Sequence, residues 1–267
     1  MFHDERRPDS GTGRSWRAVS SAAVAAVLAL VSLTACSKDS ESSTSPDSSA
    51  PTTPAETTGA PEQSIDDSLY FYPPVEGATL RYEVGGLAPG TVDVTVNSVT
   101  SGADGQTVAA TQVVTAQGES VTVEQTVRTG ADGSLSLDAA TFFASGTGFT
   151  VTGVGDAIVI PPVADLEAGR ESSGSTFVEM ESAGLSMRND VTYTVRGAGY
   201  ESVTVPAGTT EAYVVEIQLD ITSSVVGAQS GSGRYWLVPG FGLVRQEFAI
   251  AMINNSMELV SSSVPLP

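Results

Sequence analysis

The sequence predicts a mainly β fold, in which one antiparallel and strongly curved sheet forms an open barrel or sandwich. Three observations predict it. Apolar and polar residues alternate strictly in several runs, which is typical of half-buried strands. Glycine-containing turn sequences separate these runs at hairpin spacing. No long stretch shows a helical period, so we expect tight hairpins and at most one or two short helices.

The predicted strands share one pattern, in which every second side chain is apolar. These stripes are Val92, Val94 and Val96; Val121, Val123 and Val127; Val191, Tyr193 and Val195; Tyr213, Val215, Ile217, Leu219 and Ile221; and Phe248, Ile250 and Met252. Hairpin turns are predicted at "SGADGQ" (101–106), "AQGE" (116–119) and "TGADGS" (129–134), where glycine supplies positive φ.

Short helices are predicted over residues 138–144, where Asp138 is a candidate N-cap, and over residues 161–169, which begin with Pro and end with Gly. Two other glycine-containing stretches, "GAGYES" (197–202) and "GSGRYW" (231–236), lack the third glycine of a phosphate-binding loop. We interpret both as turns.

Residues 1–35 have the features of a signal peptide. Arg14 and Arg17 precede an apolar run from Ala18 to Leu33. A membrane-spanning helix needs roughly 20 apolar residues, and this run is shorter. We therefore expect export of the chain and removal of this segment.

The end of that run resembles the lipobox of bacterial lipoproteins, in which Leu and two small residues precede Cys. Here the motif is Leu33, Thr34, Ala35 and Cys36. The resemblance implies cleavage between Ala35 and Cys36 and a diacylglycerol on the Cys36 thiol. It therefore implies a chain held on the extracytoplasmic face of the cell membrane by a lipid anchor, since two or more acyl chains bind a bilayer stably. An uncleaved membrane anchor with an incidental cysteine is the alternative.

Residues 36–67 are predicted to be the lipidated Cys and a disordered tether. From Ser37 to Asp67, 17 of 31 residues are Ser, Thr or Pro, and Ile65 is the only large apolar residue. Such a composition buries too little surface to offset chain entropy. Its typical span is roughly 30 Å. Residues 68–267 then form a single β-rich extracytoplasmic domain.

Composition excludes several classes of function. The formal net charge of −19 is unfavourable for a nucleic-acid partner. The only His, Cys and Lys are His3, Cys36 and Lys38, all outside the predicted domain. Nucleophile activation by histidine and zinc or copper sites built from His or Cys are therefore excluded. We expect no catalytic residue, no metal and no cofactor.

Carboxylates are the remaining candidates for chemistry. Glu179 and Glu181 lie two residues apart and share a strand face, as a glycosidase pair could. Calcium could use Asp104, Asp132 or Asp138, but the Asp-x-Asp-x-Asp-Gly pattern is absent. Our interpretation is that these are solvated surface carboxylates.

The predicted domain resembles a family of uncharacterised, exported β-rich bacterial proteins. The resemblance lies in "YFYPPVEGATLRY" (70–82), "GYESVTVPAGTTEAYVVEI" (199–217) and "GSGRYWLVPGFGLVRQE" (231–247). Through this family it is similar to the LolA-like superfamily of curved half-barrels that carry lipid or lipoprotein acyl chains. The motif residues Pro206, Gly208, Pro239, Gly240 and Gly242 fit turn positions.

A lipid-like ligand is one expectation that the resemblance raises. Candidate apolar contacts are Phe142, Phe143 and Phe149, in a Gly-rich stretch, and Trp236. The alternative is that the three Phe complete the core and that Trp236 lies in it. For function we expect a non-catalytic binding or interaction module, whose partner is a lipid-like ligand or an envelope protein. A carboxylate-dependent glycan hydrolase and a structural envelope protein are the alternatives.

Overall fold

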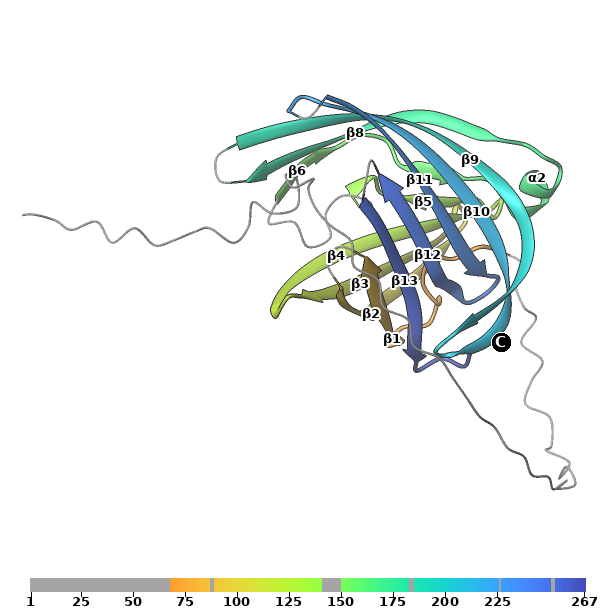
Figure 1. The fold of residues 1–267 in the computed structure, drawn as a ribbon. Helices are drawn as coiled ribbons and strands as arrows, with labels where there is room; N and C mark the ends of the chain where they lie inside the picture. The colour runs from red at the N-terminus through yellow and green to blue at the C-terminus, as the bar shows by residue number, and fades with distance from the viewer. Residues whose placement is uncertain (1–67, 87–88, 141–149, 183–184, 226, 251–252) are drawn as a thin grey trace, which may run out of the picture. The chain divides into compact units, whose positions relative to one another are not determined.

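The computed structural model describes residues 68–86, 89–140, 150–182, 185–225, 227–250 and 253–267 (Figure 1). The strands are β1 (Thr79–Gly86), β2 (Gly90–Gly102), β3 (Gly105–Ala116), β4 (Glu119–Gly130), β5 (Leu135–Leu137), β6 (Thr150–Val154), β7 (Ile158–Ile160), β8 (Ser172–Ser182), β9 (Leu185–Val205), β10 (Gly208–Ser223), β11 (Gly227–Val238), β12 (Gly242–Ile250) and β13 (Ile253–Ser262). One short helix, α2 (Val163–Glu167), joins β7 to β8. The predicted fold class is confirmed.

All the strands belong to one antiparallel sheet, in the order β6-β8-β9-β10-β11-β12-β13-β1-β2-β3-β4-β5-β7. Figure 1 shows the sheet curling strongly, with β8–β10 above and β2–β4 below in that view. Its two edge strands, β6 and β7, are consecutive in the chain and are joined by residues 155–157. The curl therefore places the sheet's first and last strands close to one another.

The stripes predicted from the sequence define the two faces of this sheet. The inner face bears Val215, Ile217, Leu219 and their neighbours, all of which are buried. The outer face bears the alternating polar side chains. The stripes of β2, β9 and β10 are confirmed as core. Val121 differs, with 42% of its surface exposed, because the inner face of β4 is exposed near the start of that strand.

The chain's first described residues fill the inner face. Leu69, Tyr70, Phe71 and Tyr72 are all buried. The Leu243 N–H of β12 donates to the Phe71 carbonyl oxygen (3.1 Å), and the Thr129 hydroxyl of β4 donates to the Leu69 carbonyl oxygen (3.2 Å). Residues 68–72 therefore cross the interior from one side of the sheet to the other.

A buried polar contact fixes Tyr72 against the opposite strands. Its hydroxyl donates to Gln125 Oε1 and accepts from Gln112 Nε2, and Gln112 Nε2 also donates to Gln125 Oε1 (2.6 Å). Burial raises the pKa of the Tyr72 phenol. The hydroxyl therefore stays neutral and satisfied inside the core.

The β2–β3 and β3–β4 hairpin turns lie where the sequence predicts them. Gln117 and Gly118 have φ values of 54° and 84° and form the two-residue β3–β4 turn. Residues 103–104 form the β2–β3 turn. The prediction of a helix within 161–169 is confirmed by α2. The other predicted helix, over residues 138–144, lies mostly outside the described residues, which end at Ala140. At its start, the Ala140 N–H donates to Asp138 Oδ1 (2.9 Å).

The turns predicted at 197–202 and 231–236 are wrong, because both stretches lie inside strands. Residues 197–202 belong to β9, where the ladder with β10 shifts register between Val214 and Val215 and Gly199 has a φ of 93°. Residues 231–236 belong to β11. A Cβ at Gly233 would lie 2.7 Å from the Tyr235 ring, so this glycine makes room for an aromatic side chain within the strand.

The predicted signal peptide, lipobox and tether (residues 1–67) lie outside the described residues. Within the part of the chain that the structure describes, no helix combines the length and apolar character needed to cross a bilayer.

Candidate functional site

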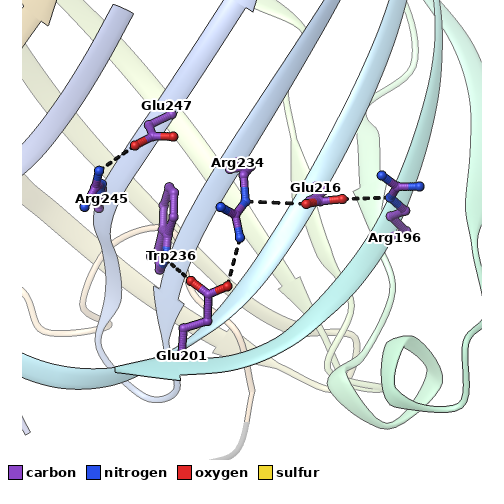
Figure 2. Close-up of polar contacts among 7 residues, drawn as sticks. All are labelled: Arg196, Glu201, Glu216, Arg234, Trp236, Arg245 and Glu247. Atoms are coloured by element: carbon purple, nitrogen blue, oxygen red, sulfur yellow. Dashed lines mark hydrogen bonds and ion pairs between the residues drawn. The ribbon is translucent and has the colours of Figure 1, made fainter. Parts of the chain in front are cut away.

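A group of charged side chains surrounds Trp236 on the outer face of β9–β12 (Figure 2). We call it the Arg–Glu–Trp cluster. Its members are Arg196 and Glu201 of β9, Glu216 of β10, Arg234 and Trp236 of β11, and Arg245 and Glu247 of β12. The register explains the grouping, because Glu216 pairs with both Arg196 and Arg234, and Arg234 also pairs with Glu247.

The ion pairs in this cluster form a continuous chain across the strands. Glu216 lies between two arginines, 2.8 Å from Arg196 Nε and 3.4 Å from Arg234 Nε. Arg234 Nη2 then lies 2.9 Å from Glu201 Oε1. Glu201 Oε2 accepts a hydrogen bond from the indole Nε1 of Trp236 (3.1 Å). Each carboxylate here is therefore held by a cation or an N–H donor.

Trp236 is buried although it lies on the outer face. The guanidinium carbons of Arg234 and Arg245 lie 4.8 Å and 4.9 Å from its ring centroid, and only 4% of its surface is exposed. Both distances fall within the range of cation–π attraction. Arg245 is itself paired with Glu247 and with Glu258 of β13. The cluster therefore combines aromatic stacking with paired charges.

A β-bulge brings Glu201 into the cluster. Before it, odd-numbered residues of β9, such as Val195, face the core. Val215 pairs with Gly197 but Val214 with Gly199, so Ala198 is the extra residue. Beyond Ala198 the odd-numbered residues share the face of Val214, and Glu201 thus lies on the outer side.

The arrangement is suited to recognition and not to acid–base catalysis. Its carboxylates are paired with arginines, whose guanidinium groups stay protonated. Trp and Arg are also the residue types most enriched at the energetic centres of protein interfaces. Among the described residues, no group of three His, Cys, Asp or Glu side chains could hold a metal ion.

The carboxylates singled out from the sequence lie apart from this cluster. Glu179 lies 2.8 Å from Arg188, and Glu181 is exposed on the same strand. Asp104 and Asp132 are exposed and Asp138 is partly buried: Asp104 lies 3.9 Å from Arg128, Asp132 accepts from the Ser134 hydroxyl (2.7 Å), and Asp138 accepts from the Ala140 N–H. Glu179 and Glu181 share one face of β8, as expected, and Glu179 is paired there with Arg188.

Of the four candidate ligand contacts, the structure describes only Trp236, which is buried as a member of the main hydrophobic core and contacts Arg234, Arg245 and Glu201 of the Arg–Glu–Trp cluster. Phe142, Phe143 and Phe149 lie outside the described residues. The described residues near both ends of that segment, Ala139 and Val151, belong to or pack on a small second apolar cluster that also contains Val178, Met180 and Met187. This cluster is separate from the main core.

Of the seven cluster residues, only Trp236 is a candidate from the sequence. Arg196, Glu201, Glu216, Arg234 and Arg245 occupy polar positions of alternating strands, where a solvated side chain needs no explanation. Their grouping depends on the register of four strands and on the bulge at Ala198. The sequence feature that could have indicated this bulge is the pair Gly197 and Gly199 inside a strand-like run, because glycine there is typical of a bulge as well as of a turn.

A single curled antiparallel sheet that wraps residues 68–72 defines the class, that of curved half-barrel β domains. Within it, the chain belongs to the DUF3108-like family, whose model matches residues 78–264. No curated protein sequence matches the chain significantly.

Two solved structures share the fold. A predicted lipoprotein from Parabacteroides distasonis superposes with a TM-score of 0.60 at 20% identity, covering 74% of this chain and 100% of its own. A predicted exported protein with a YmcC-like fold from Bacteroides fragilis has a TM-score of 0.56 at 18% identity, covering 73% of this chain and 100% of its own. At these identities the likeness is one of fold.

Proposed function

We propose that this protein is a lipid-anchored extracytoplasmic interaction module without catalytic activity, which contacts an envelope partner through the Arg–Glu–Trp cluster. Cys36 carries the anchor and residues 37–67 form the tether. The observation that carries the proposal is the concentration of arginine around Trp236 on a chain of net charge −19.

Charge distribution supports the choice of this surface. Five of the seven described arginines lie on the outer face of β1, β9, β11 and β12 (Arg81, Arg188, Arg196, Arg234 and Arg245), and Arg196, Arg234 and Arg245 belong to the cluster. Elsewhere the excess of carboxylates repels other acidic surfaces within about 8 Å at physiological salt. Over the cluster the charges are balanced, so a partner can approach closely, and the partly exposed side chains of Arg196, Arg234 and Arg245 supply contact energy there.

The tether and anchor are supported by sequence features. The lipobox-like motif follows an apolar run of signal-peptide length, and a roughly 30 Å spacer then precedes the domain. The names of the two structural relatives, a predicted lipoprotein and a predicted exported protein, agree with this placement.

The anchor is tested by Cys36→Ser in the whole chain. We expect the variant to leave the membrane fraction. Ser37→Ala is the matched control and is expected to remain membrane-bound. A Cys36→Ser variant that still sediments with membranes would contradict the anchor.

The contact surface is tested by charge reversal at Arg234. In native gels of solubilised membranes, we expect the wild-type chain in a complex larger than its own mass and the Arg234→Glu variant outside it. Arg170→Glu is the control, since Arg170 is exposed and lies just after α2, away from the cluster. Equal migration of all three chains at the monomer mass would refute this surface as a binding site.

An apolar ligand is a second candidate function, which the second apolar cluster favours. Residues 69–72 already occupy the inner face, whereas Ala139, Val178, Met180 and Met187 form a separate apolar cluster, against which Val151 packs. Methionine side chains adapt their shape to apolar ligands. Organic extraction of the purified chain tests this candidate: a stoichiometric lipid supports it, and lipid-free protein refutes it.

A further inference from the structure

Eight side chains form a polar floor on the outer face of β8–β11, beside the Arg–Glu–Trp cluster. The register places them in two rows that cross these four strands. One row is Ser173, Thr194, Gln218 and Ser232, and the other is Ser175, Thr192, Asp220 and Ser230. Within each strand the two members are two residues apart, so both point to the same face.

Longer side chains border this floor on two sides. On one side runs the ion-paired row of Arg196, Glu216 and Arg234. On the other side, the guanidinium carbon of Arg188 lies 3.9 Å from the Phe177 ring centroid. Because the floor consists mostly of short side chains, the face forms a trough that has both borders over β8–β9 and only the Arg196–Glu216–Arg234 border over β10–β11, where the next row is Thr222 and Ala228. At its β8–β10 end lies an open pocket of about 310 Å³, lined by Ser173, Gly174, Thr192, Tyr193, Thr194, Gln218 and Asp220.

The chemistry of the floor is almost entirely that of uncharged hydrogen-bonding groups. Six of the eight residues are Ser or Thr, whose hydroxyls both donate and accept, and Gln218 adds an amide. Asp220 is the single charge, and its Oδ1 accepts from the Ser230 hydroxyl (2.7 Å). No floor position is apolar, so the trough offers nothing to an acyl chain. Asp220 and the net charge of −19 both disfavour an anionic polymer.

We propose that this trough binds a neutral, unbranched glycan chain that lies across β8–β11. A glycan presents closely spaced hydroxyls that both donate and accept hydrogen bonds, as the floor does. The hydroxyls of the glycan and of the floor can therefore pair with one another when both lose water. Adjacent strands lie about 4.8 Å apart, so the four strands offer length for a short run of monosaccharide rings. A peptide would instead use a sheet edge or apolar side-chain pockets, and the floor provides neither.

This site adjoins the Arg–Glu–Trp cluster, whose Arg196–Glu216–Arg234 row borders it, and it does not depend on the lipid anchor. Titration calorimetry of the whole chain, in a detergent that contains no sugar, tests it with cellohexaose, maltohexaose and mannohexaose. We expect saturable binding of at least one of these neutral oligomers. The anionic oligomer hexagalacturonate is expected not to bind.

Two variants locate the binding to the trough. Thr192→Val with Thr194→Val removes two hydroxyls and keeps the side-chain shape, and should weaken binding about fivefold or more. Thr126→Val, at an exposed position of β4, is the matched control and should leave binding unchanged. Valine favours strands, so both variants should fold, which their thermal unfolding checks.

Three results would overturn the proposal. The first is an absence of binding by all three neutral oligomers. The second is equal binding by the wild type and the double Thr variant, which would place the glycan elsewhere. The third is selective binding of a glucosamine hexamer that Asp220→Asn abolishes, which would make the trough a site for amines.

Discussion

Phe71 offers a direct test of whether residues 68–72 are part of the domain's core. Its side chain is 4% exposed, and its ring lies 5.0 Å from that of Tyr72 in an edge-to-face arrangement. Truncating a buried Phe to Ala costs about 3–5 kcal/mol, which includes the cavity left behind. For a domain of this size each kcal/mol corresponds to about 2–4 °C, so Phe71→Ala should lower Tm by roughly 6–20 °C.

The assay is equilibrium urea unfolding of the chain from residue 36 onward with Cys36→Ser, in which Trp236 is the only tryptophan. Val75→Ala is the control from the same segment, because Val75 is 42% exposed and its loss should change stability by no more than about 0.5 kcal/mol. A Phe71→Ala loss below about 1 kcal/mol, with an unchanged m-value, would show that Phe71 is not part of the stabilising core. Residues 68–72 would then lie on the core without stabilising it.

Three further predictions concern the cluster, a surface carboxylate and a turn. Glu201→Gln weakens both the Arg234 ion pair and the Trp236 hydrogen bond; it should shift Trp236 emission and cost no more than about 1 kcal/mol, since Glu201 is partly exposed. Unchanged emission would contradict the Trp236 contact. Hydrogen bonds from Ser134 lower the pKa of Asp132 below 3.8, so its contribution is present above pH 3.8 and is lost as pH falls through the folded-state pKa. Ser134→Ala should therefore lower the free energy of unfolding at neutral pH. The free energy that the domain loses between pH 4 and pH 2, followed by acid titration, should also be smaller in the variant. An acid profile identical to that of the wild type would count against this. Gln117→Asn should raise the free energy of unfolding by about 0.5 kcal/mol, because Asn tolerates the positive φ of this turn better than Gln, and urea unfolding that shows a loss would refute it.

The strands and hairpins could be predicted because their signals are local. The alternation of Tyr213 to Ile221 marks one buried face whatever the partner strands are, and glycine in "AQGE" marks its turn. The turns predicted at 197–202 and 231–236 are wrong because a glycine inside a strand gives the same local sequence signal as a glycine in a turn. At Gly199 it marks a bulge, and at Gly233 it makes room for the Tyr235 ring.

The candidate site could not be predicted because it depends on register between distant strands. Arg196 and Arg234 are 38 positions apart in the sequence, yet both lie beside Glu216. Burial of Trp236 on an outer face is equally non-local, since two arginines and Glu201 surround it. The course of residues 69–72 through the interior also needs the curled sheet before it can be inferred.

The short link between the two edge strands limits how far this sheet can open. Val154 ends β6 and Ile158 begins β7, so four residue steps separate them. A fully extended chain covers at most about 3.6 Å per step, which keeps the two edges within about 14 Å there. Twelve interstrand spacings of about 4.8 Å would put them about 58 Å apart in a flat sheet.

The peptide chain itself therefore acts as a short strap that prevents the sheet from flattening. Cutting the chain at Asp156 would remove this limit and leave every strand pairing intact. A motion that opens the uncut domain must separate strands elsewhere in the sheet, because the distance between β6 and β7 is set by covalent bonds.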